Sequence, residues 1–415
     1  MKRSIVLALI LLLGVFALQC SKSTSPLQTG NQNGVQLSAV EKELVTAVKP
    51  FGFKLFRSLN REYGDQNVII SPLSVSLALG MTLNGAANAT YDSMAAVLGF
   101  EGMDNQTINE TYRTLIEKLT TADAKVLFEI ADAIWYRKGF DVLPDFIAAN
   151  RDYFDAAVQP GNFDQGTLDS INAWVNEKTH GKIEKILDYI NYRDVMYLIN
   201  AIYFKAVWTY QFDKQKTRDD IFSLEDGSRI SCKMMVIREK WNYFEDDRIQ
   251  AAELPYGDGK FGMVVILPKE GYSVGQIVNE LDVQRWQTIT GHFAPDSGTI
   301  QLPKFKLRFK DIMNNNLAPL GMGIAFDGQR ADFSRINPDI PLYISIVLHK
   351  TFIQVDEEGT EAAAVTLVGI RYTSVGDEPE GFTMYVNKPF IFVIRDRAND
   401  TILFMGKVTN PEWSE

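Results

Sequence analysis

The stretch DEEGTEAAAVT, residues 356–366, follows a long β-branched apolar run and precedes a glycine- and charge-bearing segment at 369–381. The alternate residues after Thr360 are all uncharged, and the first four of them are small. The two charged residues nearby, Glu361 and Arg371, fall on the opposite face. Uncharged and charged residues are therefore separated onto the two faces of an extended strand, and the uncharged face is compatible with packing against a core. Because the stretch lacks the bulky side chains of a resident core strand, it can enter a sheet without having to remain there.

The competing interpretation of this stretch is a strand, a turn at Gly359 and an ordinary solvated surface loop. Such a loop is long for a compact domain, and loops of that length are usually functional or disordered. The stretch is therefore the first candidate for a functional site.

The overall composition is that of an ordinary globular protein. The chain has 415 residues, of which 46% are hydrophobic and 23% are charged, so it is long enough to bury a large core. Its formal net charge is -10, with 42 lysines and arginines, and no basic surplus is present to neutralise phosphates. This charge balance argues against nucleic acid as a partner and favours a solubilising surface.

The N-terminus has the pattern of an export signal. Lys2 and Arg3 precede an apolar run at 5–18, which is too short for a membrane-spanning helix. Cys20 follows this run and resembles the acylated cysteine of bacterial lipoproteins, although residues 17–19 lack the usual small residue just before the cysteine. We expect an exported protein, either a cell-envelope lipoprotein anchored through Cys20 or an extracellular one. The alternative to lipidation is ordinary secretion with Cys20 removed or left free.

These patterns divide the chain into an export signal at 1–19, a flexible tether at 20–37 and a single folded domain at 38–415. The tether contains mainly small and polar residues and no aromatic residue, so it cannot bury enough surface to order itself. Cys232 is the one cysteine of the folded domain. An exported fold without an internal disulfide has to be held together by packing alone.

Hydrophobic periodicity within the folded domain predicts an α+β fold. Three segments have helical spacing, and Ser170 is the expected cap of the last one: 37–59, 73–83 and 170–186. Five apolar or β-branched segments have the character of strands: 196–204, 261–267, 343–355, 390–395 and 402–408. No linker, low-complexity tract or repeat interrupts the domain.

The sequence contains none of the familiar catalytic or metal-binding motifs. Its three histidines, His180, His292 and His349, form no HExxH pair, and no CxxC pair, GxxxxGK[ST] loop or GxSxG elbow occurs. His349 lies in an apolar strand segment, where a satisfied structural histidine is the commoner outcome. We therefore predict that the protein is not an enzyme and uses no cofactor or metal ion.

Several separated motifs resemble those of the serpin family of serine protease inhibitors, and the similarity spans nearly the whole chain after residue 45. In the order of the family, the motifs are NVIISPLS at 67–74, NAIYFKAVW at 200–208, LHK at 348–350, the hinge-like EEGTEAAAVT at 357–366, NKPF at 387–390 and FMGKV at 404–408. The resemblance implies a serpin fold of about three β-sheets and eight to nine helices, with an exposed reactive-centre loop at about 357–381.

The mechanism implied by the resemblance is inhibition by a suicide substrate. A target protease attacks the loop and becomes acylated, and the freed hinge inserts into the main sheet as a new strand. The protease is dragged away and distorted before hydrolysis finishes. The implied partners are serine endopeptidases, and cysteine endopeptidases are a further class. We expect a monomer.

The resemblance assigns roles to two groups of residues. Gly359 lets the chain reverse and Thr360 enters the sheet first, where a charge would be buried at large cost. The full hinge is Glu357, Gly359, Thr360, Glu361, Ala362, Ala363 and Ala364. A polar latch, where the strands of the sheet part, consists of Ser71, Ser74, Asn200 and His349, and Trp208 packs where the hinge enters. The alternative for the latch is ordinary satisfied core polarity, which predicts burial but no control over opening.

The position of the reactive bond depends on where the family spacing is counted from. Counting forward from Gly359 places the bond between Thr373 and Ser374. Counting backward from Asn387 gives a position near Glu378, because this loop is several residues longer on its C-terminal side.

The residue before the bond determines the class of protease. Thr373 suits an elastase- or subtilisin-like enzyme, whereas Arg371 or Tyr372 would present the loop to trypsin- or chymotrypsin-like enzymes. The main alternative function is a non-inhibitory serpin, a binding or carrier module whose loop is cleaved but never inserts. The uncharged Thr360 and the three alanines argue against that alternative.

Overall fold

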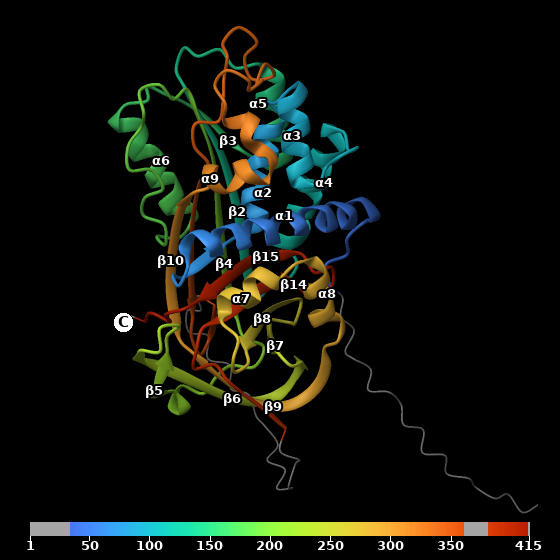
Figure 1. The fold of residues 1–415 in the computed structure, drawn as a ribbon. Coiled ribbons are helices and arrows are strands. Elements are labelled where there is room, and N and C mark those ends of the chain that lie inside the picture. Colours follow the sequence, from blue (N-terminus) through green and yellow to red (C-terminus); the bar gives the residue numbers. More distant parts are fainter. Residues whose placement is uncertain (1–33, 361–380, 414–415) are drawn as a thin grey trace, which may run out of the picture. The chain divides into compact units, whose positions relative to one another are not determined.

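The structure of the protein is a computed structural model that describes residues 34–360 and 381–413, and these form one compact unit (Figure 1). The predicted export signal, most of the predicted tether and the centre of the predicted reactive-centre loop lie outside the described residues.

The smaller of two β-sheets contains the predicted hinge. Its strands lie in the order β10 (Phe305–Ile312), β11 (Leu348–Val355), β12 (Gly359–Thr360), β4 (Met196–Val207), β2 (Val126–Arg137) and β3 (Ala157–Gly161). All neighbours are antiparallel except β2 and β3. Because β12 is antiparallel to both of its neighbours, β4 and β11 run parallel to each other on its two sides.

The larger sheet has the order β1 (Val68–Ile70), β15 (Ile402–Val408), β14 (Phe390–Asp396), β8 (Phe261–Pro268), β7 (Ile249–Tyr256), β6 (Arg229–Glu245), β9 (Ala294–Pro303) and β13 (Phe382–Tyr385), and β5 (Arg218–Ser223) pairs with β6. About three sheets were expected, and the described strands form two continuous ones. The long strand β6 accounts for this, because it pairs with β7 at its C-terminal end and with β5 and β9 along the rest of its length.

The described residues contain nine α-helices, which are α1 (Ala39–Tyr63), α2 (Pro72–Leu83), α3 (Asn88–Leu98), α4 (Asn105–Thr120), α5 (Pro144–Phe154), α6 (Gln165–Lys178), α7 (Val274–Glu280), α8 (Val283–Gly291) and α9 (Asn314–Leu317). Short turns of other helix types cover Lys214–Lys216, Ala318–Met322 and Gly323–Phe326. Most of the helices gather around the upper part of the smaller sheet in Figure 1.

The helix boundaries follow the capping residues. Ser38 caps α1 through a capping box with Glu41, so this helix begins two residues later than predicted. The prediction of Ser170 as a cap is wrong. Asp164 caps α6 instead, since its side chain accepts a hydrogen bond from the Thr167 backbone N–H, and Ser170 lies inside the helix.

The strand predicted at 343–355 is shorter in the structure and begins at Leu348. Its partner β10 ends at Ile312, which pairs with Leu348, and the chain then turns into α9. Residues 342–347 therefore have no neighbouring strand on that side, and they lie outside any strand. The other four predicted strands are present, one with the expected bounds and the others within three residues of them.

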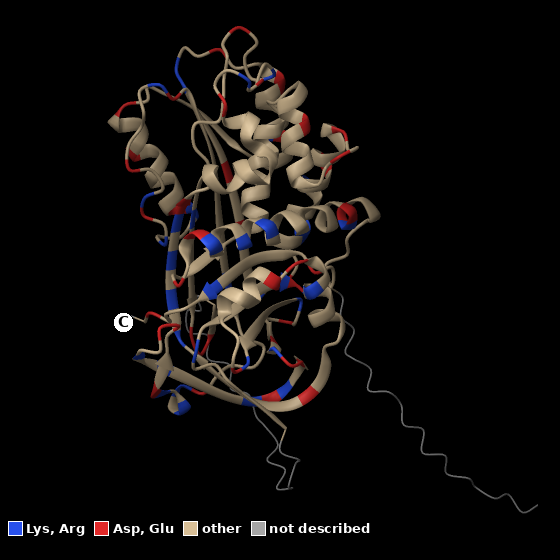
Figure 2. Ribbon diagram, viewed as in Figure 1, with Lys and Arg blue, Asp and Glu red and all other residues tan. Residues whose placement is uncertain are grey.

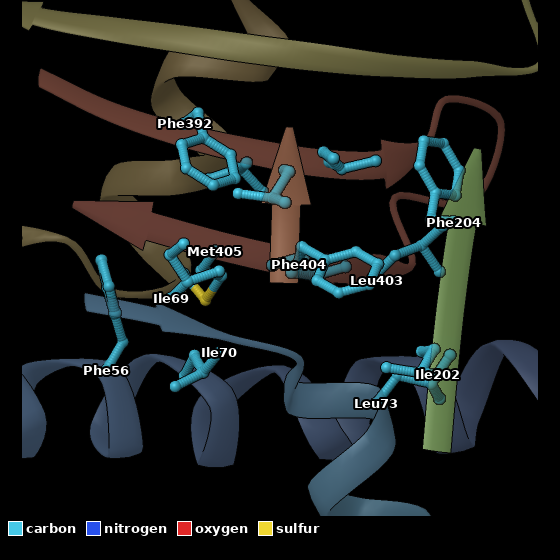
Figure 3. Close-up of a cluster of buried hydrophobic side chains, with 14 of the residues drawn as sticks. Phe56, Ile69, Ile70, Leu73, Ile202, Phe204, Phe392, Leu403, Phe404 and Met405 are labelled. Atoms are coloured by element: carbon cyan, nitrogen blue, oxygen red, sulfur yellow. The ribbon is translucent and has the colours of Figure 1, made fainter. Parts of the chain in front are cut away.

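The core fills the space between α1, α2 and the two sheets (Figure 3). The cluster in this view takes side chains from α1, β1, α2, β4, β14 and β15: Phe56, Ile69, Ile70, Leu73, Ile202, Phe204, Phe392, Leu403, Phe404 and Met405. Every residue of β8, β14 and β15 is buried, as the near-continuous apolar runs predict for central strands. Each large apolar side chain buried in this way contributes about 1.5–3 kcal/mol.

Charged side chains protect the outer edge of the smaller sheet. Lys306, Arg308 and Lys310 alternate along the edge strand β10, which Figure 2 shows as repeated blue positions. Lysine and arginine on an edge strand discourage the addition of another strand. Within the described ranges, no helix is long and apolar enough to cross a membrane.

Candidate functional site

The predicted hinge begins as a two-residue strand inside the smaller sheet. Thr360 pairs with Val355 of β11 on one side and with Ala206 of β4 on the other, and Gly359 pairs with Val207. Only glycine fits at position 359, because a Cβ atom there would lie 2.0 Å from the Ala206 carbonyl oxygen. The first residues of the hinge are therefore already a strand between β11 and β4.

An acidic turn connects β11 to this strand. The Asp356 backbone N–H donates to the Gly359 carbonyl at 2.9 Å, and the Asp356 carboxylate accepts from the backbone N–H groups of Glu358 and Gly359. Burial opposes ionisation of Glu357, but hydrogen bonds from Lys304 and Thr217 outweigh it and hold the pKa of its carboxyl below the ordinary value. The start of the hinge is thus fixed by the acidic residues that precede Thr360.

Trp208 and Tyr256 form the platform beneath Thr360. Their rings stack with centroids 4.3 Å apart and an interplanar angle of 10°. The Trp208 indole N–H donates to the Asp356 carbonyl at 2.9 Å, and the hydroxyls of Tyr256 and Thr360 lie 2.5 Å apart. Thr360 is 1% exposed, so a charged side chain at this position would have no route to water.

Beyond β12 the sheet is open between β4 and β11. In the described part of the chain, β4 pairs with β2 and β12, and β11 pairs with β10 and β12, so beyond β12 no described strand lies between β4 and β11. A cavity of about 560 Å³ lies at the end of this gap that is farthest from β12. Its lining includes residues 196–200 of β4, the segment 340–349 and residues of α2. We call this gap the slot.

A series of hydrogen-bonded polar groups, all buried except the half-buried Asn200, crosses the slot and includes all four predicted latch residues. His349 Nε2 accepts from the Ser71 backbone N–H at 3.2 Å, and Ser71 Oγ accepts from the Ser74 backbone N–H at 3.1 Å. Ser74 Oγ bonds to Asn200 Oδ1, and Asn200 Nδ2 donates to Asp132 Oδ1 at 2.9 Å. The groups come from α2, β4, β11 and β2, so the chain connects the two sides of the slot.

Asp132 is the one residue of this hydrogen-bonded series that sequence analysis did not predict. It is 3% exposed in the middle of β2 and lies opposite Asn200 in the strand register. The sequence feature that could have indicated this buried residue is a single carboxylate within the apolar stretch IADAIWY at 130–136. Burial raises the pKa of Asp132 to about 7, against a hydrogen bond from Asn200 that lowers it. Burial lowers the pKa of His349 to about 4, so this histidine is neutral at physiological pH.

The remaining predicted site residues are placed as follows. Glu361, the three alanines of the hinge, the candidate reactive-bond residues from Arg371 to Ser374 and the lipidation candidate Cys20 lie outside the described residues. A hydrolase that uses His349 would need this ring exposed beside a nucleophile, but the ring is buried and accepts a hydrogen bond from a backbone N–H. Among the described residues, no cluster of His, Cys, Asp or Glu is arranged to hold a metal ion.

Comparison with known families assigns this fold. The family described as Serpin (serine protease inhibitor) matches residues 46–411. The chain belongs to the serpin family. The family is described as one of protease inhibitors and not of enzymes, so the predictions of a serpin fold and of a protein that is not an enzyme are confirmed.

Relatives of this serpin cover almost its whole length. The leukocyte elastase inhibitor of Xenopus tropicalis is 33% identical over 89% of this chain and 100% of its own. Among solved structures, the thermophilic serpin tengpin in its native state is 36% identical with a TM-score of 0.81, covering 90% of this chain and 95% of tengpin. Human thyroxine-binding globulin is 25% identical with a TM-score of 0.82, covering 90% of this chain and 100% of its own.

Asp132→Asn is expected to change how the stability of this serpin depends on pH. Between pH 4 and pH 7 the native state keeps a proton on Asp132 that the unfolded state has lost, so this residue makes stability fall as pH rises. The full effect above pH 7 is at most about 4 kcal/mol. Asparagine keeps an acceptor for Asn200 without the charge, so the variant should melt at a higher temperature than the wild type at pH 8 and at nearly the same temperature at pH 4.

The control for this measurement is Asp141→Asn, which removes an exposed carboxylate. His349 acts in the opposite direction, since its neutral native form costs stability as pH falls from 6.5 to 4. It is present in both proteins, so the difference between variant and wild type isolates Asp132. A difference in melting temperature that is the same at every pH would contradict this assignment.

Proposed function

We propose that this serpin inhibits serine proteases by inserting its cleaved reactive-centre loop into the slot between β4 and β11. The observation that carries the proposal is the register of β12. In an antiparallel pair, a residue six positions further along one strand faces the residue six positions earlier in the other strand. Starting from the pairs of Thr360, residue 366 would then lie between Asn200 and His349.

The same register matches the loop to the slot along its inner face. Ala362 would lie beside Phe204 and Ile353, which are buried in the main core. Ala364 would lie beside Ile202 and Thr351 in the same way. Small side chains fit here because these neighbours are already packed in the core, and an added methylene in a packed core typically costs about 1–3 kcal/mol.

After Thr360, Thr366 is the next polar residue on the inner face of the loop. The register places it beside the polar latch. Its hydroxyl can both donate and accept a hydrogen bond there, beside the polar side chains of Asn200 and His349. On the outer face, Leu367 would lie beside Ile199 and Leu348, which belong to the cluster of apolar side chains under α6. On both faces of the sheet, the alternating side chains of the inserted loop would therefore match the character of their neighbours in β4 and β11.

Insertion supplies enough free energy to distort a bound protease. A new central strand of about 12 residues forms roughly 10 hydrogen bonds at about 1 kcal/mol each, and burial of its side chains adds several kcal/mol. A protease domain is held together by about 5–15 kcal/mol in total. Insertion at the charged outer edge beside β10 would gain half of these bonds, so the slot is the favoured place.

The proposed reactive bond is Thr373–Ser374. The serine Oγ of the protease attacks the Thr373 carbonyl carbon, the peptide bond to Ser374 breaks, and the new α-amine of Ser374 takes the proton that the serine gave up. The protease stays attached to Thr373 through an ester. Thr373 favours an elastase- or subtilisin-like target, which agrees with the relatives named as leukocyte elastase inhibitors. Arg371 and Tyr372 are the alternatives for trypsin- and chymotrypsin-like targets.

We also propose that the protein is exported and held at the cell envelope through a lipid on Cys20, as in bacterial lipoproteins. In the proposed division into signal, tether and folded domain, the last residues of the tether pack against the domain, since Val35 and Leu37 are buried before α1 starts at Ala39. A monomer on a flexible tether would leave the reactive loop free to meet a protease.

The first test is incubation with elastase, subtilisin, trypsin and chymotrypsin. At least one enzyme should form a covalent complex that survives detergent, and the cleaved inhibitor should melt at a much higher temperature than the intact protein, because the loop has become a central strand. Mass spectrometry of the released peptide identifies the bond. Cleavage by every enzyme with an unchanged melting temperature would contradict the proposal and would favour a binding or carrier serpin.

The second test is Thr360→Arg. This position is buried against Tyr256, so an arginine must either remain outside the sheet or bury its charge at large cost. The variant should be cleaved as a substrate, and its yield of covalent complex should fall at least about tenfold, which corresponds to 1.4 kcal/mol. Thr46→Arg on the exposed side of α1 is the matched control and should leave the yield unchanged. An equal yield from both variants would exclude entry of the hinge at Thr360.

A further inference from the structure

Positive side chains gather on the more exposed face of the smaller sheet, beside its edge strand. They come from β10, from β11 and from the segment 182–188 that follows α6: Lys182, Lys185, Lys306, Arg308, Lys310 and Lys350. Figure 2 shows the positions on β10 as repeated blue bands. Because the whole chain has a formal net charge of -10, this concentration of positive charge is a local exception. We call these six residues the basic strip.

One aromatic ring holds two cations of the strip side by side. Lys182 Nζ lies 5.4 Å from the centre of the Phe352 ring, and the guanidinium carbon of Arg308 lies 5.1 Å from the same point. Phe352 is directly opposite Arg308 in the register of β10 and β11. Cations are attracted to the face of an aromatic ring, so Phe352 brings the segment after α6 and the edge strand together.

The other end of the strip surrounds a single carboxylate with lysines. Lys310 lies opposite Lys350 in the strand register and forms an ion pair with Asp188, and Lys350 Nζ donates to the Lys185 carbonyl at 2.5 Å. A hydrogen bond from Lys310 and the charges of Lys350 and Lys185 hold the pKa of Asp188 below its ordinary value. Burial, together with the neighbouring charges of Lys310 and Arg308, lowers the pKa of Lys350.

Protection of the sheet edge explains only part of the strip. The three cations of β10 lie on the edge strand, where they discourage the addition of another strand. Lys350 lies one strand further in, and like charges that face each other directly destabilise a strand pair. Lys182 and Lys185 lie outside the sheet. Six cations have Glu184 and Asp188 as nearby carboxylates, so a surplus of positive charge remains for a partner.

The spacing of the strip favours a linear partner of high charge density. From Lys306 to Lys310 the strip spans about 13 Å, since a strand rises about 3.3 Å per residue. Six cations within this length call for about one negative charge for every 2–3 Å of a linear partner. An extended acidic peptide presents only alternate side chains to one face, which gives about one charge for every 7 Å. A polymer with a charge on every short repeat fits the strip better.

The ring of Phe352 argues against a nucleic acid as this polymer. Proteins that bind single strands stack the bases on aromatic rings. Lys182 and Arg308 both lie over the Phe352 ring, so this ring positions cations and is not available for a base. The partner therefore needs dense negative charge and no aromatic group.

We propose that the basic strip binds inorganic polyphosphate, a linear chain with a negative charge on each phosphate unit. The ammonium and guanidinium groups of the strip would donate charge-assisted hydrogen bonds to the phosphate oxygens. A bound chain would also offset the repulsion between Lys310 and Lys350, which face each other. This inference does not depend on loop insertion, because every residue of the strip lies outside the hinge and the loop.

The experiment is titration of the intact protein with fluorescently labelled long-chain inorganic polyphosphate. The affinity should fall about a hundredfold when salt rises from about 50 mM to about 200 mM, because about five phosphate contacts each contribute a slope of about −0.7. Orthophosphate, polyglutamate, single-stranded DNA, dextran sulfate and vesicles of phosphatidylglycerol should each compete at least about tenfold less well than polyphosphate at equal charge. Absence of binding, or equal or better competition by any of these probes, would overturn the proposal.

A pair of variants locates the binding site. Lys310→Gln combined with Lys350→Gln should weaken polyphosphate binding at least about tenfold and reduce the salt slope by about 1.4, because two of the contacts are lost. Lys42→Gln combined with Lys54→Gln is the matched control, since it removes two exposed lysines of α1 and the same net charge. This control should bind nearly as the wild type does. Equal weakening by both pairs would show that binding follows net charge alone and would overturn the strip as the site.

A second variant keeps the test decisive if the first does not fold, which a melting curve reveals. Lys182→Gln combined with Lys185→Gln changes only the segment after α6, outside the sheet. It should also weaken polyphosphate binding at least about tenfold relative to the α1 control. Wild-type affinity in this variant would contradict the proposal, because the strip needs both the sheet and this segment.

Discussion

A two-residue strand with neighbours on both sides is the constraint on which the functional part of this structure depends. Gly359 and Thr360 pair with β4 and with β11, and they hold these strands one strand apart at one end of the sheet. Beyond them no described strand lies between β4 and β11, and a cavity lies at the end of the gap farthest from β12. Unpaired strand edges are a source of free energy for any segment that can complete the sheet. The chain carries such a segment directly after Thr360.

The latch connects the two sides of the slot through polar side chains. Ser71, Ser74, Asn200, Asp132 and His349 satisfy one another across the slot, which lowers the cost of leaving it open. Two of these groups have pKa values moved by burial in opposite senses, to about 7 for Asp132 and about 4 for His349. Both are therefore neutral, or nearly so, in mildly acidic solution, and the slot contains little net charge for an entering strand to meet.

The sequence alone predicted the chemistry of the hinge and of the latch better than their geometry. Gly359 and Thr360 stand out through local spacing, and the family resemblance pointed to Ser71, Ser74, Asn200 and His349, which the structure brings together. The open slot could not be predicted, because it depends on which distant strands pair and where β10 ends. Asp132 was missed because one carboxylate in an apolar strand is a weak signal. Ser170 is not the cap because Asp164, six residues earlier, caps the same helix.

Amide hydrogen exchange of the cleaved inhibitor tests the central claim most directly, because it reports on residues 361–370 one peptide at a time. If these residues become a strand between β4 and β11, their amides will exchange as slowly as those of β2 and β4, and the amides of β4 and β11 that face the slot will slow together with them. If residues 361–370 exchange at the rate of a free peptide after cleavage while the rest of the sheet is unchanged, the loop has not entered the slot, and the proposed inhibitory mechanism is wrong.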